Sequence, residues 1–191
     1  MQGANPTIGL SYTETRKVFQ ALRFAAEKHS SQRRKDRDAS PYINHPIALA
    51  DVLVNEGGIT DHVIICAAIL HDTIEDTETT AAEITDAFGH EIASIVAEVT
   101  DDKSLEKSVR KQRQIERAVY ISPQAKLVKL ADKICNLRDL ANAPPAHWST
   151  QRRIEYFDWA ARVVARLGCE NPALTQAFQK ALAASPPETA A

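Results

Sequence analysis

The chain contains few cysteines and few glycines, and each scarcity argues against a class of structure. Three of the 191 residues are cysteine, an odd number of widely spaced thiols that does not fit a disulfide framework. We therefore expect reduced thiols and a cytoplasmic protein. Six residues are glycine, and neither a Gly-rich phosphate loop nor a Ser or Cys nucleophile setting is apparent.

Long apolar runs and an excess of one charge are also missing. No run approaches the roughly 20 apolar residues that a membrane span needs. Residues 1–10 lack the basic start and apolar stretch of a secretory signal. The formal net charge of -2 removes any general electrostatic attraction to nucleic acid or an anionic membrane. We expect neither as a partner, and a polyanion would need a local basic cluster.

What the chain has in abundance is apolar residues at helical spacing. No stretch alternates convincingly with period two, so we predict an all-α fold. A length of 191 residues suffices for one buried core but is short for two domains. We expect a single domain over residues 1–191, with its core at about 13–184 and frayed termini.

The first three predicted helices have recognisable starts. Ser11 and Glu14 form a capping-box pattern. A second helix is expected to begin near His45-Pro46, to continue through Ile47, Ala50 and Leu53, and to stop at Gly57-Gly58. The third, residues 63–70, is capped by Thr60 or Asp61 and is apolar on all sides, which predicts a position in the centre of the fold.

Later helices are predicted from the same signals. Thr80 with Glu83 forms a second capping-box pattern. Pro123 opens a long helix, residues 150–167 form a further one, and Asn171-Pro172 starts the last. The charged segment 101–116 is typical of a solvated helix or a mobile loop. The sequence leaves open whether it closes over a site.

The dipeptide His71-Asp72 ends the buried third helix. Polar groups at this position are costly unless they are partnered. A metal ion can supply the partner, and so can ordinary hydrogen bonds around a core histidine. The dipeptide alone does not decide between the two.

Two other segments favour the metal. His45 stands at a helix start, where it can project into a cleft, and Asp132 lies on the inward side of an apolar helix with Asn136 one turn later. Together with His71 and Asp72 they offer two imidazoles and two carboxylates. That donor set suits Mn, Fe, Co or Zn better than Ca or Mg.

Further charged residues flank these candidate ligands. Glu75 and Asp76 follow the dipeptide, and they are either a base beside the metal or the start of a solvated loop. Arg34 and Lys35 belong to a basic run, residues 33–37, that is suited to phosphates but is equally typical of a solvated surface. The other histidines are expected at surface or capping positions; they are His29, His62, His90 and His147. The aromatic residues near 148–159 are expected in the core; they are Trp148, Tyr156, Phe157 and Trp159.

The ordered set of motifs resembles the hydrolase domain of Rel/Spo-type stringent-response enzymes, and the stand-alone small alarmone hydrolases most closely. The motifs are Arg34-Lys35, Tyr42-Ile-Asn-His45-Pro46, Leu70-His71-Asp72-Thr-Ile-Glu75-Asp76-Thr77, Val99-Thr100 and Val128-Lys129-Leu130-Ala131-Asp132-Lys133-Ile-Cys-Asn136-Leu-Arg138. The resemblance covers roughly residues 21–167. Beyond the metal motifs it includes residues 156–160.

This resemblance implies an HD-type helical fold and a specific reaction. It implies Mn²⁺ held by His45, His71, Asp72 and Asp132. It further implies that Glu75 and Asp76 assist the attacking water. Arg34, Lys35, Asn136 and Arg138 would bind a guanine nucleotide alarmone, (p)ppGpp, which would be cleaved to GDP or GTP and pyrophosphate. No companion synthetase domain is expected after residue 167.

Two alternatives remain open from the sequence. The same site could act as a phosphohydrolase on NADPH or another nucleotide, releasing orthophosphate instead of pyrophosphate. The chain could also be a non-catalytic nucleotide-binding regulator that retains the fold. The full ligand set with Glu75-Asp76 argues against the regulator.

Overall fold

The computed structural model describes residues 9–187, and this range forms an all-helical fold, as predicted. The frayed ends that we expected fall mainly on residues 1–8 and 188–191, which lie outside the described range. The elements are α1 (Tyr12–Lys28), α2 (Asn44–Asp51), the π-helical η1 (Val52–Glu56), α3 (His62–Leu70), α4 (Thr73–Asp76), α5 (Ala81–Phe88), α6 (His90–Val99), α7 (Lys107–Arg117), α8 (Pro123–Asn142), α9 (Thr150–Leu167) and α10 (Pro172–Leu182).

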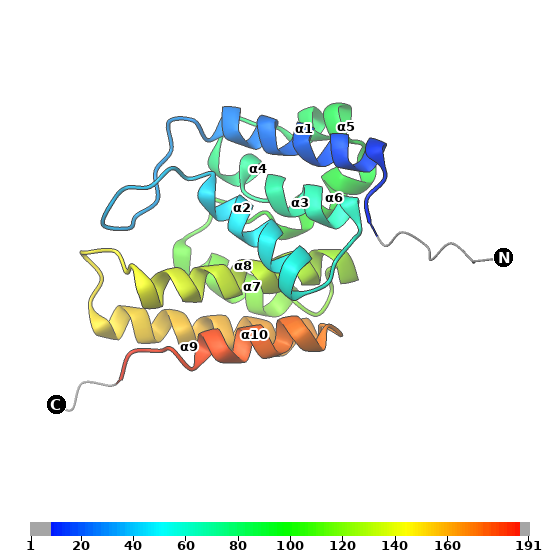
Figure 1. Ribbon diagram of the computed structural model, residues 1–191. Coiled ribbons are helices and arrows are strands. Elements are labelled where there is room, and N and C mark those ends of the chain that lie inside the picture. Colours follow the sequence, from blue (N-terminus) through cyan, green and yellow to red (C-terminus); the bar gives the residue numbers. More distant parts are fainter. Residues whose placement is uncertain (1–8, 188–191) are drawn as a thin grey trace.

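Two helices form the centre of the molecule. Helix α3 is buried over Val63–Leu70, which confirms the position predicted from its uniformly apolar sequence. Helix α8 packs against α2, α3 and α6 on one side and against α9 and α10 on the other (Figure 1). A polar residue on the inward face of either helix therefore lies deep in the fold.

The helix starts were largely predicted from their caps. The reciprocal capping box of Ser11 and Glu14 is present. Asp61, not Thr60, caps α3 by accepting from the Val63 N–H. Thr80 accepts from the Glu83 N–H, but the predicted box is incomplete because Glu83 instead binds Lys28 Nζ at 2.6 Å.

The second predicted helix corresponds to α2 and η1, and the apolar residues that it runs through are not all buried. Ile47 is 44% exposed, whereas Leu49, Val52 and Leu53 are buried. After Asp51 the helix continues as the π-helical segment η1. His45 and Pro46 begin the face that is actually buried.

The charged segment after α6 has a defined position. Residues 101–106 form a connection without helical structure, and α7 follows with no buried residue. Helix α7 packs against α9. Among the described helices, none has the length and apolar character required to span a membrane.

Candidate metal centre and active site

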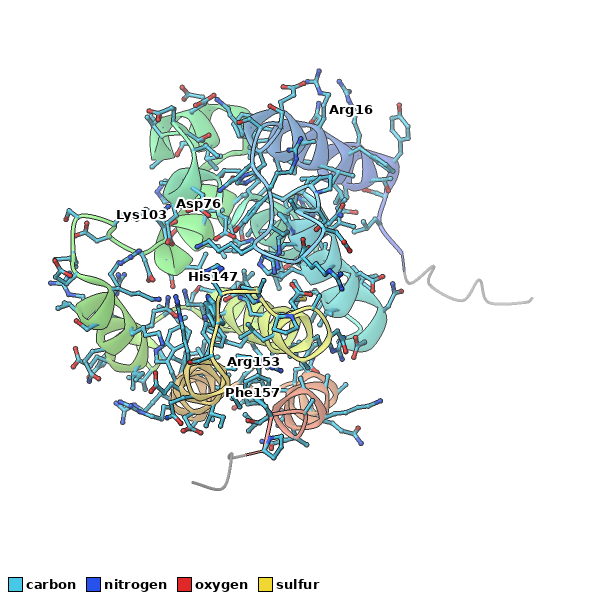
Figure 2. All side chains as sticks on the ribbon, turned by 90° about the vertical axis from the view of Figure 1, so that its left-hand side faces the viewer. Arg16, Asp76, Lys103, His147, Arg153 and Phe157 are labelled. Carbon is cyan, nitrogen blue, oxygen red and sulfur yellow. The ribbon has the colours of Figure 1, made fainter. Side chains whose placement is uncertain are left out.

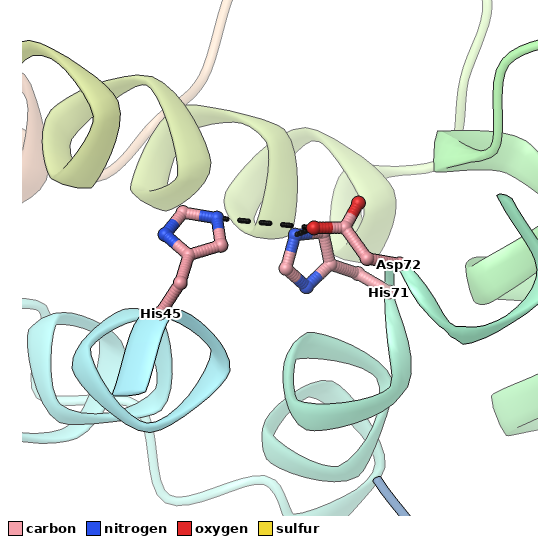
Figure 3. A group of neighbouring side chains, drawn as sticks. All are labelled: His45, His71 and Asp72. Atoms are coloured by element: carbon pink, nitrogen blue, oxygen red, sulfur yellow. Dashed lines mark ion pairs between the residues drawn. The ribbon is translucent and has the colours of Figure 1, made fainter. Parts of the chain in front are cut away.

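The candidate ligands come from three elements that are far apart in sequence. His45 lies in the first turn of α2, His71 and Asp72 follow α3, and Asp132 lies in the middle of α8. Figure 3 shows the His45 side chain projecting from α2 toward the pair at the end of α3. The central packing of α3 and α8 fixes the positions from which these groups converge.

The four side chains meet at short distances. His71 Nε2 lies 2.9 Å from Asp72 Oδ2, and His45 Nε2 lies 3.3 Å from Asp132 Oδ1. The two remaining cross distances, His45 Nε2 to Asp72 and His71 Nε2 to Asp132, are each 4.0 Å. Ligand atoms of His45, His71 and Asp72 all lie within 4.8 Å of one another, a spacing that one ion can bridge.

The orientation of His71 fits a metal ion. Its Nδ1 lies 2.7 Å from the Ala68 carbonyl oxygen, an acceptor, so Nδ1 carries the proton. In the neutral ring the lone pair of Nε2 then points into the cluster. Nε2 is buried and lies 2.9 Å from Asp72 Oδ2. A buried nitrogen of this kind together with two carboxylates matches the preferences of a divalent transition metal.

The charges of the cluster are strongly coupled. Burial alone would lower the pKa of His71, but the Asp72 carboxylate raises it to about 9. Burial would raise the pKa of Asp72, yet the His71 imidazole holds it below its usual value. The pKa of Asp132 is likewise held well below its usual value, against burial, by the Lys133 ammonium group. Both carboxylates are therefore anionic and able to bind a cation.

Neighbouring residues hold the two carboxylates in place. The Tyr42 hydroxyl donates to Asp72 Oδ2. Asn136 Nδ2 donates to Asp132 Oδ1 at 2.6 Å, and Lys133 Nζ donates to Asp132 Oδ2 at 2.9 Å. Asn136 was predicted as a site residue from the sequence, but Tyr42 and Lys133 were not. Both stand within three residues of a candidate ligand, but nothing in the sequence distinguished them from core residues.

A cavity of about 330 Å³ opens beside this cluster. Its lining combines the four candidate ligands with the two candidate catalytic carboxylates and with polar and aromatic residues from α7, α8 and α9. The lining residues are Lys35, Tyr42, His45, His71, Asp72, Glu75, Asp76, Val99, Asp101, Gln114, Val128, Lys129, Asp132, Lys133, Asn136, Tyr156 and Trp159.

Glu75 and Asp76 lie in α4 and are contacted by the segment that follows α6. Glu75 Oε2 accepts from the Asp101 N–H at 2.9 Å, and Arg110 lies 3.9 Å from Glu75 Oε1. Burial raises the pKa of Glu75, although the Asp101 N–H opposes this. Asp76 pairs with Lys103, and the two labelled side chains lie together in Figure 2. The segment 101–116 therefore borders the cavity.

The four predicted substrate-binding residues differ in how they lie relative to the cavity. Lys35 and Asn136 line the cavity. Arg34 lies next to it, over the Tyr42 ring at 5.7 Å and paired with Asp139. Arg138 is not brought to the cavity, because its guanidinium forms a bidentate pair with Glu56 at 2.5 and 2.8 Å.

Two aromatic residues that we assigned to the core also line the cavity. Trp159 is buried and its indole N–H donates to the Lys111 carbonyl at 3.0 Å. Its ring and that of Tyr156 form one cavity wall. Among the histidines that were not assigned to the site, His29 is the C-cap of α1, and a capping position was expected. Its side chain is buried against the Tyr42 ring.

Comparisons with known proteins agree with this arrangement. The model of the HD domain family matches residues 21–170. The chain is 52% identical over 88% of its length to the mouse guanosine-3′,5′-bis(diphosphate) 3′-pyrophosphohydrolase MESH1, of which it covers 94%. It is 48% identical over 81% of its length to the Drosophila melanogaster protein of that name, of which it covers 87%. A solved structure described as a metazoan orthologue of SpoT that hydrolyses ppGpp superposes with a TM-score of 0.85, at 45% identity, over 87% of this chain and 94% of that one.

Proposed function

Because the chain belongs to the HD domain family, we propose that it is a metal-dependent hydrolase that removes the 3′-pyrophosphate from the alarmone (p)ppGpp. The products are GDP or GTP and pyrophosphate. The observation that carries the proposal is the convergence of His45, His71, Asp72 and Asp132 beside Glu75 in one cavity. The relatives that carry this activity in their names match most of the chain.

We assign Mn²⁺ as the native metal and these four side chains as its ligands. Their mixed nitrogen and oxygen donors suit this ion. When bound, the ion supplies electrophilic stabilisation of phosphoryl oxygens and acidifies water. Tyr42 and Lys133 keep the Asp72 and Asp132 carboxylates oriented toward the common centre.

Glu75 is the proposed base for the attacking water. Its raised pKa brings its basicity closer to that of a proton acceptor working near neutral pH. The Asp101 N–H fixes Oε2 of Glu75, and Arg110 lies 3.9 Å from Oε1, the oxygen that we propose accepts the proton of the attacking water. Asp76 adds negative charge at the same wall and is held by Lys103.

Lys35, Asn136 and Arg34 are the proposed contacts to the nucleotide. Lysine and arginine provide cations for phosphate oxygens, and arginine also stacks on a base. Asn136 provides an amide at the cavity wall. Arg138 is left out of this set because it joins α8 to η1 through Glu56.

The three cysteines are free in the structure. Free thiols are typical of a reducing compartment. We therefore propose a cytoplasmic location, where guanine nucleotides are also available.

Product analysis tests the function. Purified protein with Mn²⁺ is incubated with (p)ppGpp, and the products are separated by chromatography; we expect GDP or GTP and stoichiometric pyrophosphate. Parallel incubation with NADPH tests the alternative phosphohydrolase, which would release orthophosphate. Protein that binds (p)ppGpp but leaves it intact would be a regulator and would refute the enzymatic proposal.

A further inference from the structure

His29 is a buried histidine with no assigned part in the proposed reaction. It is the C-cap of α1, and 2% of its surface is exposed. The connection from α1 to α2 begins at this residue (Figure 1). His29 does not line the catalytic cavity. It can therefore affect the reaction only through other residues.

Two contacts join His29 to Tyr42. The two rings lie against each other, with their centroids 4.8 Å apart and an angle of 36° between their planes. Gln32 provides the second connection. Its side-chain oxygen lies 2.5 Å from His29 Nδ1, and its backbone carbonyl accepts from the Tyr42 N–H at 3.1 Å. Both the ring and the backbone of Tyr42 are therefore held in relation to His29.

Tyr42 in turn contacts two of the proposed metal ligands. Its hydroxyl donates to Asp72 Oδ2, and the centroid of its ring lies 6.1 Å from that of the His45 ring. Outer-shell hydrogen bonds orient the ligands of a metal, and their loss typically costs about 10- to 100-fold in metal affinity. The direction in which the Tyr42 hydroxyl points depends on the position of its ring, which packs on His29.

The second nitrogen of the His29 ring indicates that stability alone does not account for this residue. The Gln32 side-chain oxygen is an acceptor, so Nδ1 carries the proton and Nε2 is an acceptor in the neutral ring. Nε2 is buried and has no hydrogen-bond partner within residues 9–187. A buried polar atom without a partner costs free energy, and an apolar side chain of similar size would avoid this cost. Such local conflicts are typical of functional sites.

We propose that His29 is a positioning residue of the metal centre. It holds Tyr42 so that the hydroxyl of Tyr42 keeps the Asp72 carboxylate turned toward the common centre of the ligands. This inference rests on the proposed function and adds to it a residue that contacts neither the metal nor the substrate. The effect arises from the ring packing and the Gln32 contact, and it requires no charge on the imidazole.

Mn²⁺ binding in the absence of substrate tests this role. The full chain, freed of metal, is titrated with Mn²⁺ in a calorimeter, and the dissociation constant is compared between variants. His29→Leu fills the same space but removes both the donor to Gln32 and the flat contact with Tyr42. We expect it to weaken Mn²⁺ binding about tenfold, the lower end of the range for outer-shell partners.

The stability of the metal-free protein separates positioning from a purely structural role. The melting temperature of His29→Leu should stay close to the wild-type value, because removal of the unpartnered Nε2 offsets the lost hydrogen bond to Gln32. His29→Asn also lacks the ring, and it is the second substitution at this position if the leucine variant does not fold. We expect the same loss of Mn²⁺ affinity from it.

A double-mutant cycle tests whether the effect passes through Tyr42. Tyr42→Phe removes the hydroxyl and should itself weaken Mn²⁺ binding by about 10- to 100-fold. Because His29 acts through that hydroxyl, His29→Leu should weaken binding by no more than about twofold further in the Tyr42→Phe protein.

His62→Leu is the matched control. His62 Nδ1 lies 3.2 Å from Glu14 Oε1 at the opposite end of α1. This substitution therefore also removes an imidazole and a contact of α1, but it leaves Tyr42 untouched. Mn²⁺ binding should keep its wild-type strength.

Three results would overturn the assignment. They are a His29 variant that binds Mn²⁺ as tightly as the wild type, a His29→Leu effect that is equally large in the Tyr42→Phe protein, and a His62→Leu variant with the same loss. Failure of the proposed function is recognised separately. In that case (p)ppGpp releases no pyrophosphate, whatever the order of the Mn²⁺ affinities is.

Discussion

Glu75 differs from the four candidate metal ligands in its contacts. It accepts from a backbone N–H, and its raised pKa arises mainly from burial. We expect Glu75→Gln to lower kcat by about 10²- to 10⁴-fold, the usual contribution of a general base. Bound metal should remain, because the ligands are untouched, and elemental analysis of the purified variant measures it. His71→Ala is the matched control and should lose both metal and turnover. Loss of metal from Glu75→Gln would make Glu75 a ligand.

The ionisation of Glu75 also predicts a pH dependence. A base must be deprotonated to accept a proton, so activity falls as the pH drops through the pKa of Glu75. Because burial raises this pKa above its ordinary value of 4.5, we expect the acidic limb of kcat against pH to have its midpoint above 4.5. The profile is recorded at saturating substrate and Mn²⁺. A midpoint at or below 4.5 would show that another group controls the limb.

The sequence placed several site residues by helical spacing and missed others. Asn136 is four residues after Asp132, about 40° further round the helix, and it lines the same cavity. Arg138 is six residues after Asp132, about 240° round, and this rotation carries it to Glu56 instead. The resemblance had included Arg138 in the binding set, although its position on the helix directs it away from Asp132. The contacts of Asp76 with Lys103 and of Arg34 with Asp139 cross long stretches of chain, and no local pattern encodes them.

At the scale of elements, helix starts were easier to predict than departures from a regular α-helix. Caps and prolines are local signals, and they located the starts of α1, α8 and α10. The π-helical turn of η1 after α2 was not predicted, because residues 45–56 were interpreted from the sequence as one regular helix. For segment 101–116, composition allowed a helix or a loop, and the structure contains both.

Position 57, where η1 meets α10, is predicted not to tolerate a side chain larger than that of glycine. A Cβ atom on Gly57 would lie 2.7 Å from the Leu53 carbonyl oxygen and 2.9 Å from Leu174 Cγ. Asn171 Nδ2 also donates to the Gly57 carbonyl at 2.8 Å, so the backbone cannot move away freely. We expect Gly57→Ala to destabilise the protein by about 1–3 kcal/mol, as overpacking does. Chemical denaturation measures the loss.

Gly9→Ala is the control for this substitution, because nothing lies within 4 Å of a Cβ atom at that position. It should leave the unfolding free energy close to the wild-type value. Equal stability of the Gly57→Ala variant would mean that α10 shifts without cost. In that event the helix carrying His45 would be less firmly held than the packing of η1 against α8 and α10 implies.

At the scale of the whole molecule, the candidate ligands join parts of the chain that are distant in sequence. They extend from α2 through the end of α3 to α8, across the centre of the fold. A single domain over the full chain stays a prediction, and the described residues support it with one core to which residues from α1 to α10 contribute. A ligand that binds only the folded state stabilises it, and this site exists only when all three segments are in place.

Metal binding should therefore raise the melting temperature. At a free Mn²⁺ concentration of about 100 times Kd the gain is about 2.7 kcal/mol, which for a chain of this size corresponds to roughly 5–10 °C. Asp132→Asn should lose most of this rise, because it removes a ligand charge while keeping an oxygen to accept from Lys133 and Asn136. Asp158→Asn, an exposed change of equal charge on α9, should keep the full rise. Differential scanning calorimetry with and without Mn²⁺ measures both variants. The same rise in Asp132→Asn would show that the ion binds elsewhere and that the convergence of the four side chains does not create its site.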